Sequence, residues 1–177
     1  MNSNAYRLVI ISLYVSMALI LSYLESFIPF PIPYAKIGLA NIITLVSLLT
    51  LDWPLTILVV IARTTLSGYL FGGPTTIVYS LSGGLLSLLV MALILHFSKN
   101  NISYILISVF GSITHNIGQI LMAVLVTQTV NLATFYILTL TPVAIITGLF
   151  IGITVQELMR LLNKTTIFSK LNLPQKK

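Results

Sequence analysis

The sequence contains no cysteine, and only three of its 177 residues are acidic. Without cysteine the chain can form no disulfide bond, no thiolate metal site and no cysteine nucleophile. The three acids, Glu25, Asp52 and Glu157, lie on separate segments. An enzyme that uses Mg²⁺ to act on diphosphates needs carboxylates that cluster. We therefore expect neither a metal site nor catalysis from this chain.

Sequence motifs for nucleotide and acyl-transfer chemistry are missing as well. No Gly-x-x-x-x-Gly-Lys-Ser/Thr loop occurs, so the chain is not expected to hydrolyse ATP by a P-loop mechanism. Neither a Gly-x-Ser-x-Gly elbow nor a plausible Ser-His-Asp set occurs. The sequence therefore predicts a protein that is not an enzyme and that carries no cofactor.

Charged residues of either sign are scarce. They make up 7% of the chain, whereas a soluble domain carries about 25%. Hydrophobic residues make up 57%, and the mean hydropathy is +1.05. So few charges could not cover a water-exposed surface, so lipid must cover most of it. This composition predicts a multi-pass protein of the cell membrane.

Six apolar segments approach the length needed to cross a bilayer, which is about 20 residues in a helix. They cover residues 8–28, 37–51, 55–70, 76–97, 102–126 and 133–158. The second and third are short and only residues 52–54 separate them, so a single long buried hairpin is the alternative. We predict an all-α membrane protein with six transmembrane helices, forming one domain over residues 1–160, and a basic tail over residues 161–177.

The positions of Lys and Arg predict the orientation. If both termini are cytoplasmic, that side carries Arg7, Lys99 and five cations near the C-terminus, while Lys36 lies outside. The positive-inside rule favours this arrangement. The basic tail then faces anionic lipid, and nucleic acid is not expected as a partner. No small-x-small cleavage site follows the first apolar run, so we read it as a retained helix and not as a secretory signal.

Polar residues at membrane depth are costly, and each needs an explanation. With the predicted orientation, seven of them converge on the outer half of the bundle: Glu25, Lys36, Asn41, Arg63, His115, Asn116 and Gln119. His115 and Gln119 are four residues apart and therefore share one helix face. This convergence favours a polar pocket that binds a small molecule.

A structural role is the alternative for each of these residues. Arg63 either pairs with Glu25 and holds two helices together, or binds an anionic group of a ligand through its planar fork of donors. Lys36 either extends to the membrane interface or contacts the ligand. Asn41 is equally suited to bridging helices. His115 by itself would be an ordinary histidine of the bundle interior.

Aromatic residues flank the loop after the third segment. Tyr69 and Phe71 stand beside a sharp turn that continues through Gly72, Gly73 and Pro74. Aromatics near an interface are typical belt residues, but they also suit a lid over a ring-shaped ligand. We include Tyr69 in the predicted binding site, and residues 71–74 as a predicted gating loop.

Small residues on the first segment predict close helix contacts. Ser12 and Ser16 form one pair at a spacing of four, and Ala18 and Ser22 form another. The two pairs lie on faces about 200° apart. Helices in lipid associate where small side chains allow close approach. We expect one face to serve the bundle and the other to serve a partner protein.

Four ordered motifs carry a resemblance to a known family. They are LES at 24–26 with KIGLANI at 36–42, Arg63 with GYLFGG at 68–73, LSGGLLS at 81–87, and GSITHNIGQ at 111–119. Together they resemble the Gx transporter family, which is also labelled heptaprenyl diphosphate synthase component I. The resemblance covers nearly all of the chain up to about residue 152.

The resemblance implies a fold, a function and partners. The family is similar to the substrate-binding S components of energy-coupling factor (ECF) transporters, six-helix proteins that capture vitamins or related compounds from outside the cell. Such proteins work with a transmembrane coupling protein and two cytoplasmic ATPases, which would explain the missing P-loop. They dock on the coupling protein through the small face of their first helix, which implies a docking role for Ala18 and Ser22 here.

The second family label implies a substrate and an alternative. An association with polyprenyl and quinone synthesis implies a quinone precursor such as a naphthoate, whose carboxylate Arg63, Lys36 and His115 would receive while Asn41 and Gln119 bond its hydroxyls. A flavin or another ring-bearing vitamin is also open. The alternative function is a non-catalytic membrane subunit associated with heptaprenyl diphosphate synthase. A self-sufficient ion- or proton-coupled carrier is less favoured, because His115 is the only relay candidate at depth.

Overall fold

The structure is a computed structural model that describes residues 3–28, 36–98 and 102–164. Within these residues the chain forms six helices and no strand. The helices are α1 (Ser3–Ser26), α2 (Asn41–Thr50), α3 (Trp53–Phe71), α4 (Pro74–Phe97), α5 (Tyr104–Thr127) and α6 (Asn131–Lys164). Residues 29–35, the turn that contains Lys99 and the tail beyond residue 164 lie outside the described residues.

Local sequence explains where several helices begin and end. Pro54 and Pro74 lie in the first turns of α3 and α4, where the missing N–H costs no hydrogen bond. The Ser103 side chain accepts a hydrogen bond from the Leu106 N–H at 3.2 Å and caps α5. α5 ends at Thr127, and the residue that caps its C-terminus, Gln128, has a left-handed φ of 53°.

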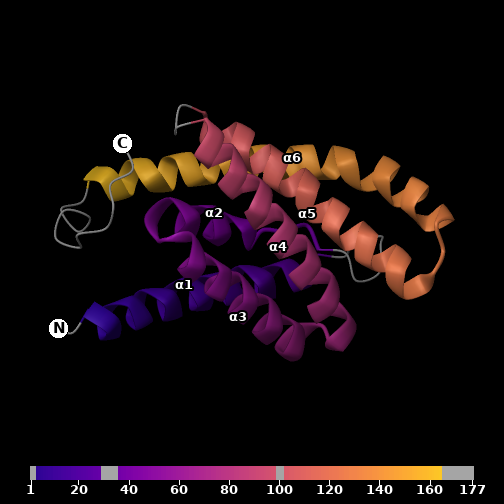
Figure 1. The fold of residues 1–177 in the computed structure, drawn as a ribbon, viewed down its shortest axis with the longest axis horizontal. Coiled ribbons are helices and arrows are strands. Elements are labelled where there is room, and N and C mark those ends of the chain that lie inside the picture. Colours follow the sequence, from indigo (N-terminus) through magenta and orange to yellow (C-terminus); the bar gives the residue numbers. More distant parts are fainter. Residues whose placement is uncertain (1–2, 29–35, 99–101, 165–177) are drawn as a thin grey trace.

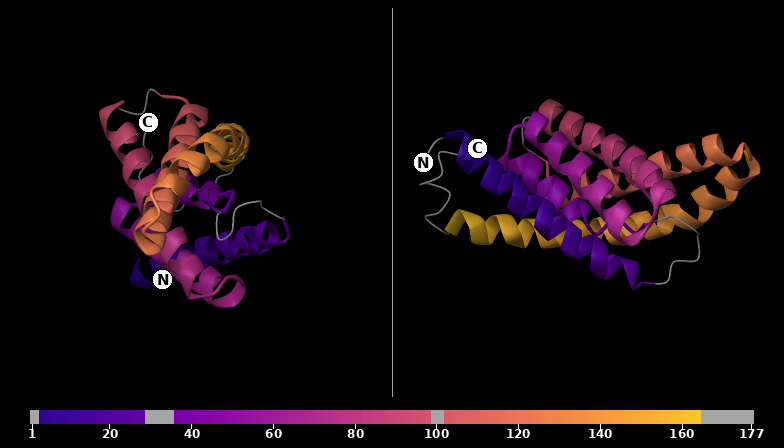
Figure 2. Two further views of the ribbon diagram at one scale, coloured as in Figure 1. Left: turned by 90° about the vertical axis from the view of Figure 1, so that its right-hand side faces the viewer. Right: turned by 90° about the horizontal axis from the view of Figure 1, so that it is seen from below.

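Five helices form the wall of the bundle, and α2 lies inside it. α1 packs on α3, α3 on α4, α4 on α5, and α5 on α6, while α2 contacts all five. Figures 1 and 2 show α6 running the length of the molecule, with α2 between it and α1. The Tyr14 hydroxyl of α1 lies 2.7 Å from the Thr50 hydroxyl at the end of α2.

α2 differs from the predicted second transmembrane helix. Its ten residues span about 15 Å, half of the roughly 30 Å hydrocarbon thickness. All of them are buried except Leu49, which is partly buried. The other five helices are long and apolar enough to cross a membrane. Residues 36–40 enter the bundle without helical structure, which is tolerated at membrane depth only where protein covers the backbone.

The two ends of the described chain lie at the same end of the bundle. α1 begins and α6 ends on the left of Figure 1, and the turns between α3 and α4 and between α5 and α6 lie toward the opposite end. This arrangement agrees with termini on one side of the membrane. That this side is cytoplasmic stays a prediction from the positive-inside rule. α6 continues to Lys164, beyond the predicted domain boundary at residue 160.

Candidate polar binding site

The structure brings the predicted polar residues from four segments into the interior. Six of them are buried, with 2–5% of each side chain exposed: Glu25 on α1, Asn41 on α2, Arg63 on α3, and His115, Asn116 and Gln119 on α5. Lys36 is partly buried just before α2. We call these seven residues the polar cluster. Their role in binding a substrate stays a prediction.

Arg63 is held by Asn41. One terminal guanidinium nitrogen, Nη2, donates to Asn41 Oδ1 at 3.0 Å. The Arg63 Nε makes no hydrogen bond with any described residue, although it is buried. Buried donors in native proteins are nearly always paired, so an unpaired one calls for an explanation. The guanidinium therefore keeps unused bonding capacity in the bundle interior.

Glu25 is engaged by backbone, and not by Arg63. Its Oε1 accepts a hydrogen bond from the Gly38 N–H at 2.5 Å. Among the described residues the one ion pair within 4.0 Å joins Glu157 and Arg160, both exposed on α6. The alternative in which Glu25 and Arg63 form a direct ion pair is therefore wrong. Glu25 instead fixes the segment before α2, where Gly38 adopts a φ of 92° that favours glycine.

Gln119 fixes the same segment from the other side. The Lys36 backbone N–H donates to Gln119 Oε1 at 3.3 Å, and Gln119 Nε2 lies 2.8 Å from His115 Nε2. The i, i+4 spacing on α5 places His115 and Gln119 on one helix face, as the sequence predicted, and there they contact each other. Desolvation lowers the pKa of Lys36, the charge of Arg63 lowers it further, and the charge of Glu25 opposes both.

Asn116 points to a different contact. Its Nδ2 donates to the Leu140 carbonyl of α6 at 3.2 Å. Asn116 is next to His115 in sequence, so it lies about 100° around the helix from it. Its amide links α5 to α6, the structural role that competes with the predicted binding role.

Three glycines shape the cluster, although from the sequence they were expected only to belong to motifs and to helix packing. A Cβ at Gly38 would lie 2.9 Å from Asn41 Nδ2, and one at Gly83 would lie 3.0 Å from His115 Cε1. A Cβ at Gly84 would lie 3.4 Å from Arg63 Nη2. α4 therefore approaches both His115 and Arg63 through bare backbone. Adjacent glycines inside an apolar helix were the signal available, because glycine there is otherwise costly.

Tyr69 does not belong to the polar cluster. Its side chain is 81% exposed on the outer surface of α3. The position of Tyr69 therefore gives no support to the prediction that it contacts substrate, because no neighbouring helix among the described residues covers this side of α3. Phe71 instead packs near Tyr23 of α1, with ring centroids 5.2 Å apart.

The predicted gating loop is a tight two-residue turn. α3 ends at Phe71, α4 begins at Pro74, and the Gly72 and Gly73 N–H groups both donate to the Gly68 carbonyl, at 3.0 and 2.6 Å. Thr76 Oγ1 also donates to the Gly72 carbonyl at 2.8 Å. Gly73 has a φ of 82°. These bonds hold the turn to both helices, and a gating role stays a prediction.

The two small faces of α1 have different surroundings. Ala18 and Ser22 are 0% and 2% exposed and face the bundle. The docking role predicted for them conflicts with this burial, because the chain itself already covers that face. Ser12 and Ser16 are exposed, and the Ser16 hydroxyl donates to the Ser12 carbonyl at 2.8 Å. Only this second face is open to a partner.

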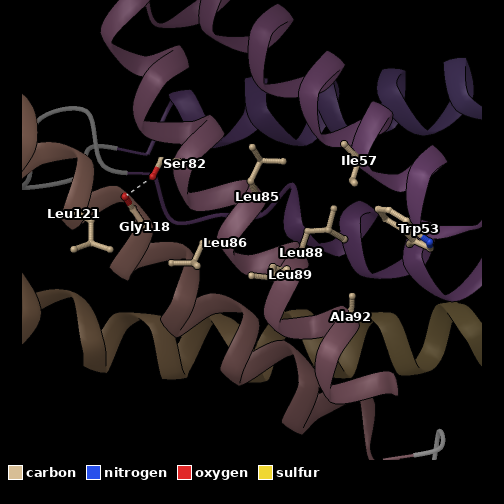
Figure 3. A pocket seen from close by; sticks show the side chains of 10 residues that line it. All are labelled: Trp53, Ile57, Ser82, Leu85, Leu86, Leu88, Leu89, Ala92, Gly118 and Leu121. Atoms are coloured by element: carbon tan, nitrogen blue, oxygen red, sulfur yellow. Dashed lines mark hydrogen bonds between the residues drawn. The ribbon is translucent and has the colours of Figure 1, made fainter. Parts of the chain in front are cut away.

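A separate apolar groove lies on the outer side of α3, α4 and α5 (Figure 3). It has a volume of about 530 Å³ and shares no residue with the polar cluster. Apolar side chains such as Trp53, Leu85 and Leu121 line it, and the Ser82 hydroxyl donates to the Gly118 carbonyl at 2.8 Å at one end. Lipid tails suit such a surface in a membrane protein.

Comparison with known proteins identifies the family and nothing closer. No curated protein and no solved structure matches the chain. A family model matches residues 14–158, which include every member of the polar cluster. With most of its length matched, this chain belongs to the family described as heptaprenyl diphosphate synthase component I.

Proposed function

We propose that the protein is the substrate-binding subunit of an ECF-type importer and captures a small aromatic anion from outside the cell. The observation that supports this most is the buried Arg63, which no carboxylate neutralises by direct contact and whose Nε has no partner among the described residues. A buried guanidinium is costly unless something pairs with it. An anionic ligand would supply that partner.

The position of the cluster also supports capture from one side. Glu25 lies one residue before the end of α1, in the half of the bundle away from both described chain ends. With cytoplasmic termini this half faces outward. In the proposed cycle a ligand enters first, the loops at this end close over it second, and the protein reorients on its coupling subunit last. A naphthoate-like quinone precursor is the favoured substrate, and a flavin is the second choice.

The proposed partners are a transmembrane coupling protein and two cytoplasmic ATPases. We propose the exposed Ser12–Ser16 face of α1 as the contact with the coupling protein, since small residues let helices approach closely in lipid. The ATPases would supply the ATP hydrolysis for which this chain has no motif. The chain itself would not be an enzyme.

A second function is favoured by the family's description. The words "heptaprenyl diphosphate synthase component I" suggest a non-catalytic membrane subunit that accompanies a prenyl-diphosphate synthase. Affinity purification in mild detergent separates the two proposals. Recovery of a coupling protein with two ATPases supports the importer, whereas recovery of a prenyl synthase without them contradicts it.

Ligand binding tests the site itself. Purified protein should bind 2-naphthoate without ATP, and Arg63→Ala should weaken binding at least tenfold. Arg160→Ala removes an exposed arginine far from the cluster and serves as the matched control. Equal losses in both variants would count against the proposed site.

A further inference from the structure

The hydrogen bonds of the polar cluster determine which way its amides and imidazole point. The Lys36 N–H can only donate, so the Gln119 atom that it meets is the oxygen. Gln119 Nε2 is then the atom beside His115, and it donates to His115 Nε2 at 2.8 Å. A neutral imidazole has one acceptor and one donor nitrogen. The proton of His115 therefore sits on Nδ1.

The same reasoning fixes Asn41. An arginine has no acceptor, so Arg63 Nη2 must donate to Asn41 Oδ1, and Asn41 Nδ2 is left as a donor. Asn41 Nδ2 and Arg63 Nε lack a hydrogen bond with any described residue, and both are buried. The His115 imidazole differs from them, because the Gly83 backbone of α4 interacts with it. The cluster therefore presents two buried N–H donors that lack acceptors among the described residues.

The two donors belong to side chains that contact each other, because Arg63 Nη2 donates to Asn41 Oδ1 at 3.0 Å. A Cβ on Gly38 would be 2.9 Å from Asn41 Nδ2 and 3.5 Å from His115 Cδ2, so the same glycine lies beside the amide and the imidazole. A Cβ on Gly84 of α4 would be 3.4 Å from Arg63 Nη2, so bare backbone also lies beside the guanidinium. Asn41 and Arg63 therefore form one buried donor pair.

The polar cluster also carries an excess of positive charge. In their ordinary ionised forms, Lys36 and Arg63 carry two positive charges against the single carboxylate of Glu25. That carboxylate is already engaged by the Gly38 N–H. One negative charge with free acceptor oxygens would therefore complete both the charge balance and the hydrogen bonds.

We propose that the ligand presents a single carboxylate to Asn41 Nδ2 and Arg63 Nε, and that Asn41 acts as a donor that selects for it. This proposal deepens the proposed function by naming the ligand's recognised group. Gln119 already uses its oxygen for the Lys36 N–H and one of its two amide N–H donors for His115, which leaves one N–H that could reach a substrate hydroxyl. A neutral amide in place of the carboxylate would offer one acceptor and no charge, so it should bind poorly.

The first test replaces the donor by an acceptor. Asn41→Asp keeps an oxygen for Arg63 Nη2, removes the Nδ2 donor and adds the missing negative charge. We expect the ligand-free N41D protein to unfold at a higher temperature than the wild type and to bind 2-naphthoate at least tenfold more weakly. Asn163→Asp makes the same chemical change at an exposed position on α6 and should alter neither quantity. A lower unfolding temperature for N41D, with N163D unchanged, would overturn the proposal.

The second test compares head groups on one ring system. Binding of 2-naphthoate, 2-naphthamide and 2-naphthyl phosphate to the wild type is measured by calorimetry in nanodiscs. We expect the carboxylate to bind at least tenfold more tightly than the amide, and more tightly than the phosphate, whose second charge exceeds the imbalance. Equal binding of amide and carboxylate, or preference for the phosphate, contradicts the assignment.

A third variant keeps the test decisive if N41D does not fold. Arg63→Gln retains a donor for Asn41 but removes the excess charge, and it should bind 2-naphthoate and 2-naphthamide equally. If Arg63→Gln still prefers the carboxylate tenfold, the assignment is wrong. Failure of the importer proposal is seen separately, as absence of the coupling protein and ATPases from purified complexes, and it leaves these binding results intact.

Discussion

A membrane-embedded carboxylate need not be a counterion, and Glu25 illustrates the difference. Its side chain accepts from the backbone of Gly38, whose left-handed conformation is needed to turn the chain into α2. The acid therefore orders the approach to the site, while Arg63 is satisfied in part by a neutral amide. Each residue of the cluster thus has a distinguishable role that substitution can separate.

Removing the Glu25 carboxylate should destabilise the protein. Glu25→Ala leaves the buried Gly38 N–H without its acceptor, which costs about 1–3 kcal/mol. Glu25→Gln keeps an acceptor oxygen and should lose less. Reversible unfolding in mixed micelles measures both, with the exposed Glu157→Ala as control. If Glu25→Ala were as stable as Glu157→Ala, the role of Glu25 in fixing the segment before α2 would be refuted.

Lys36 should make ligand affinity depend on pH. Folding lowers its pKa, so the folded protein gains stability as the pH rises through that lowered pKa. A bound carboxylate favours the protonated amine instead, so binding takes up a proton and affinity falls as the pH rises through the same range. Titration of 2-naphthoate binding against pH should show this decline in the wild type. Lys36→Gln should flatten the profile and Lys164→Gln should not; a flat wild-type profile would exclude Lys36 from the site.

At the scale of the elements, the short length of α2 and the glycine pair of α4 create the site. α2 is too short to span the bilayer, which places its first residue, Asn41, inside the bundle and not at its surface. α4 is long, but its glycine pair removes side chains where His115 and Arg63 need room. A short helix and a bare helix face together leave space for polar groups.

Adding a methyl group at Gly84 should affect binding more than folding. The new Cβ would lie 3.0 Å from Val60 Cγ1, which must give by a few tenths of an ångström, and 3.4 Å from Arg63 Nη2, so the methyl group would fill the space beside the guanidinium. We expect Gly84→Ala to weaken 2-naphthoate binding severalfold to tenfold with a modest loss of stability. Gly152→Ala, whose Cβ would meet the Ile105 backbone of α5, should reduce stability without a specific loss of binding. The reverse pattern would contradict the role given to Gly84.

The sequence predicted the elements better than it predicted the faces they present. Apolar length placed all six helices, and the largest differences are at the start of α1 (8 predicted, 3 found), the start of α2 (37 predicted, 41 found) and the end of α6 (158 predicted, 164 found). Before α2, the apolar run from Ile37 to Ala40 has the composition of a helix. The left-handed conformation of Gly38 and its hydrogen bond to Glu25 keep this run from being helical. Tyr69 is exposed and Ala18 is buried, contrary to the surroundings expected for their predicted roles, because periodicity tells which residues share a face but not which neighbour covers that face.

At the scale of the whole molecule, the polar cluster could be predicted because the cost of polar groups in lipid forces them to converge. The sequence could not predict which residues of the cluster form hydrogen bonds with one another. The Arg63–Asn41 and Glu25–Gly38 contacts join residues 22 and 13 positions apart, and they depend on how α2 sits between its neighbours. No pattern in one sequence fixes that placement.

A bulky substitution on the exposed face of α1 tests the proposed partner surface. Ser16→Trp places a large side chain on the exposed face of α1, and it should sharply reduce co-purification of a coupling protein and its ATPases while leaving 2-naphthoate binding unchanged. Leu149→Trp, on an exposed part of α6, is the control. Undiminished co-purification with Ser16→Trp would move the docking surface elsewhere on the molecule.

The length of α6 has a mechanical consequence. Its 34 residues measure about 51 Å, well beyond the roughly 30 Å hydrocarbon layer, and its last turns carry the exposed pair Glu157 and Arg160 and then Lys164. If the molecule moved along the membrane normal, away from the side on which α6 ends, these charges would enter the hydrocarbon layer. The cost of moving these charges into the hydrocarbon layer therefore opposes displacement of α6 along the membrane normal, and we propose that any movement of the bundle in a transport cycle would be a tilt within the membrane.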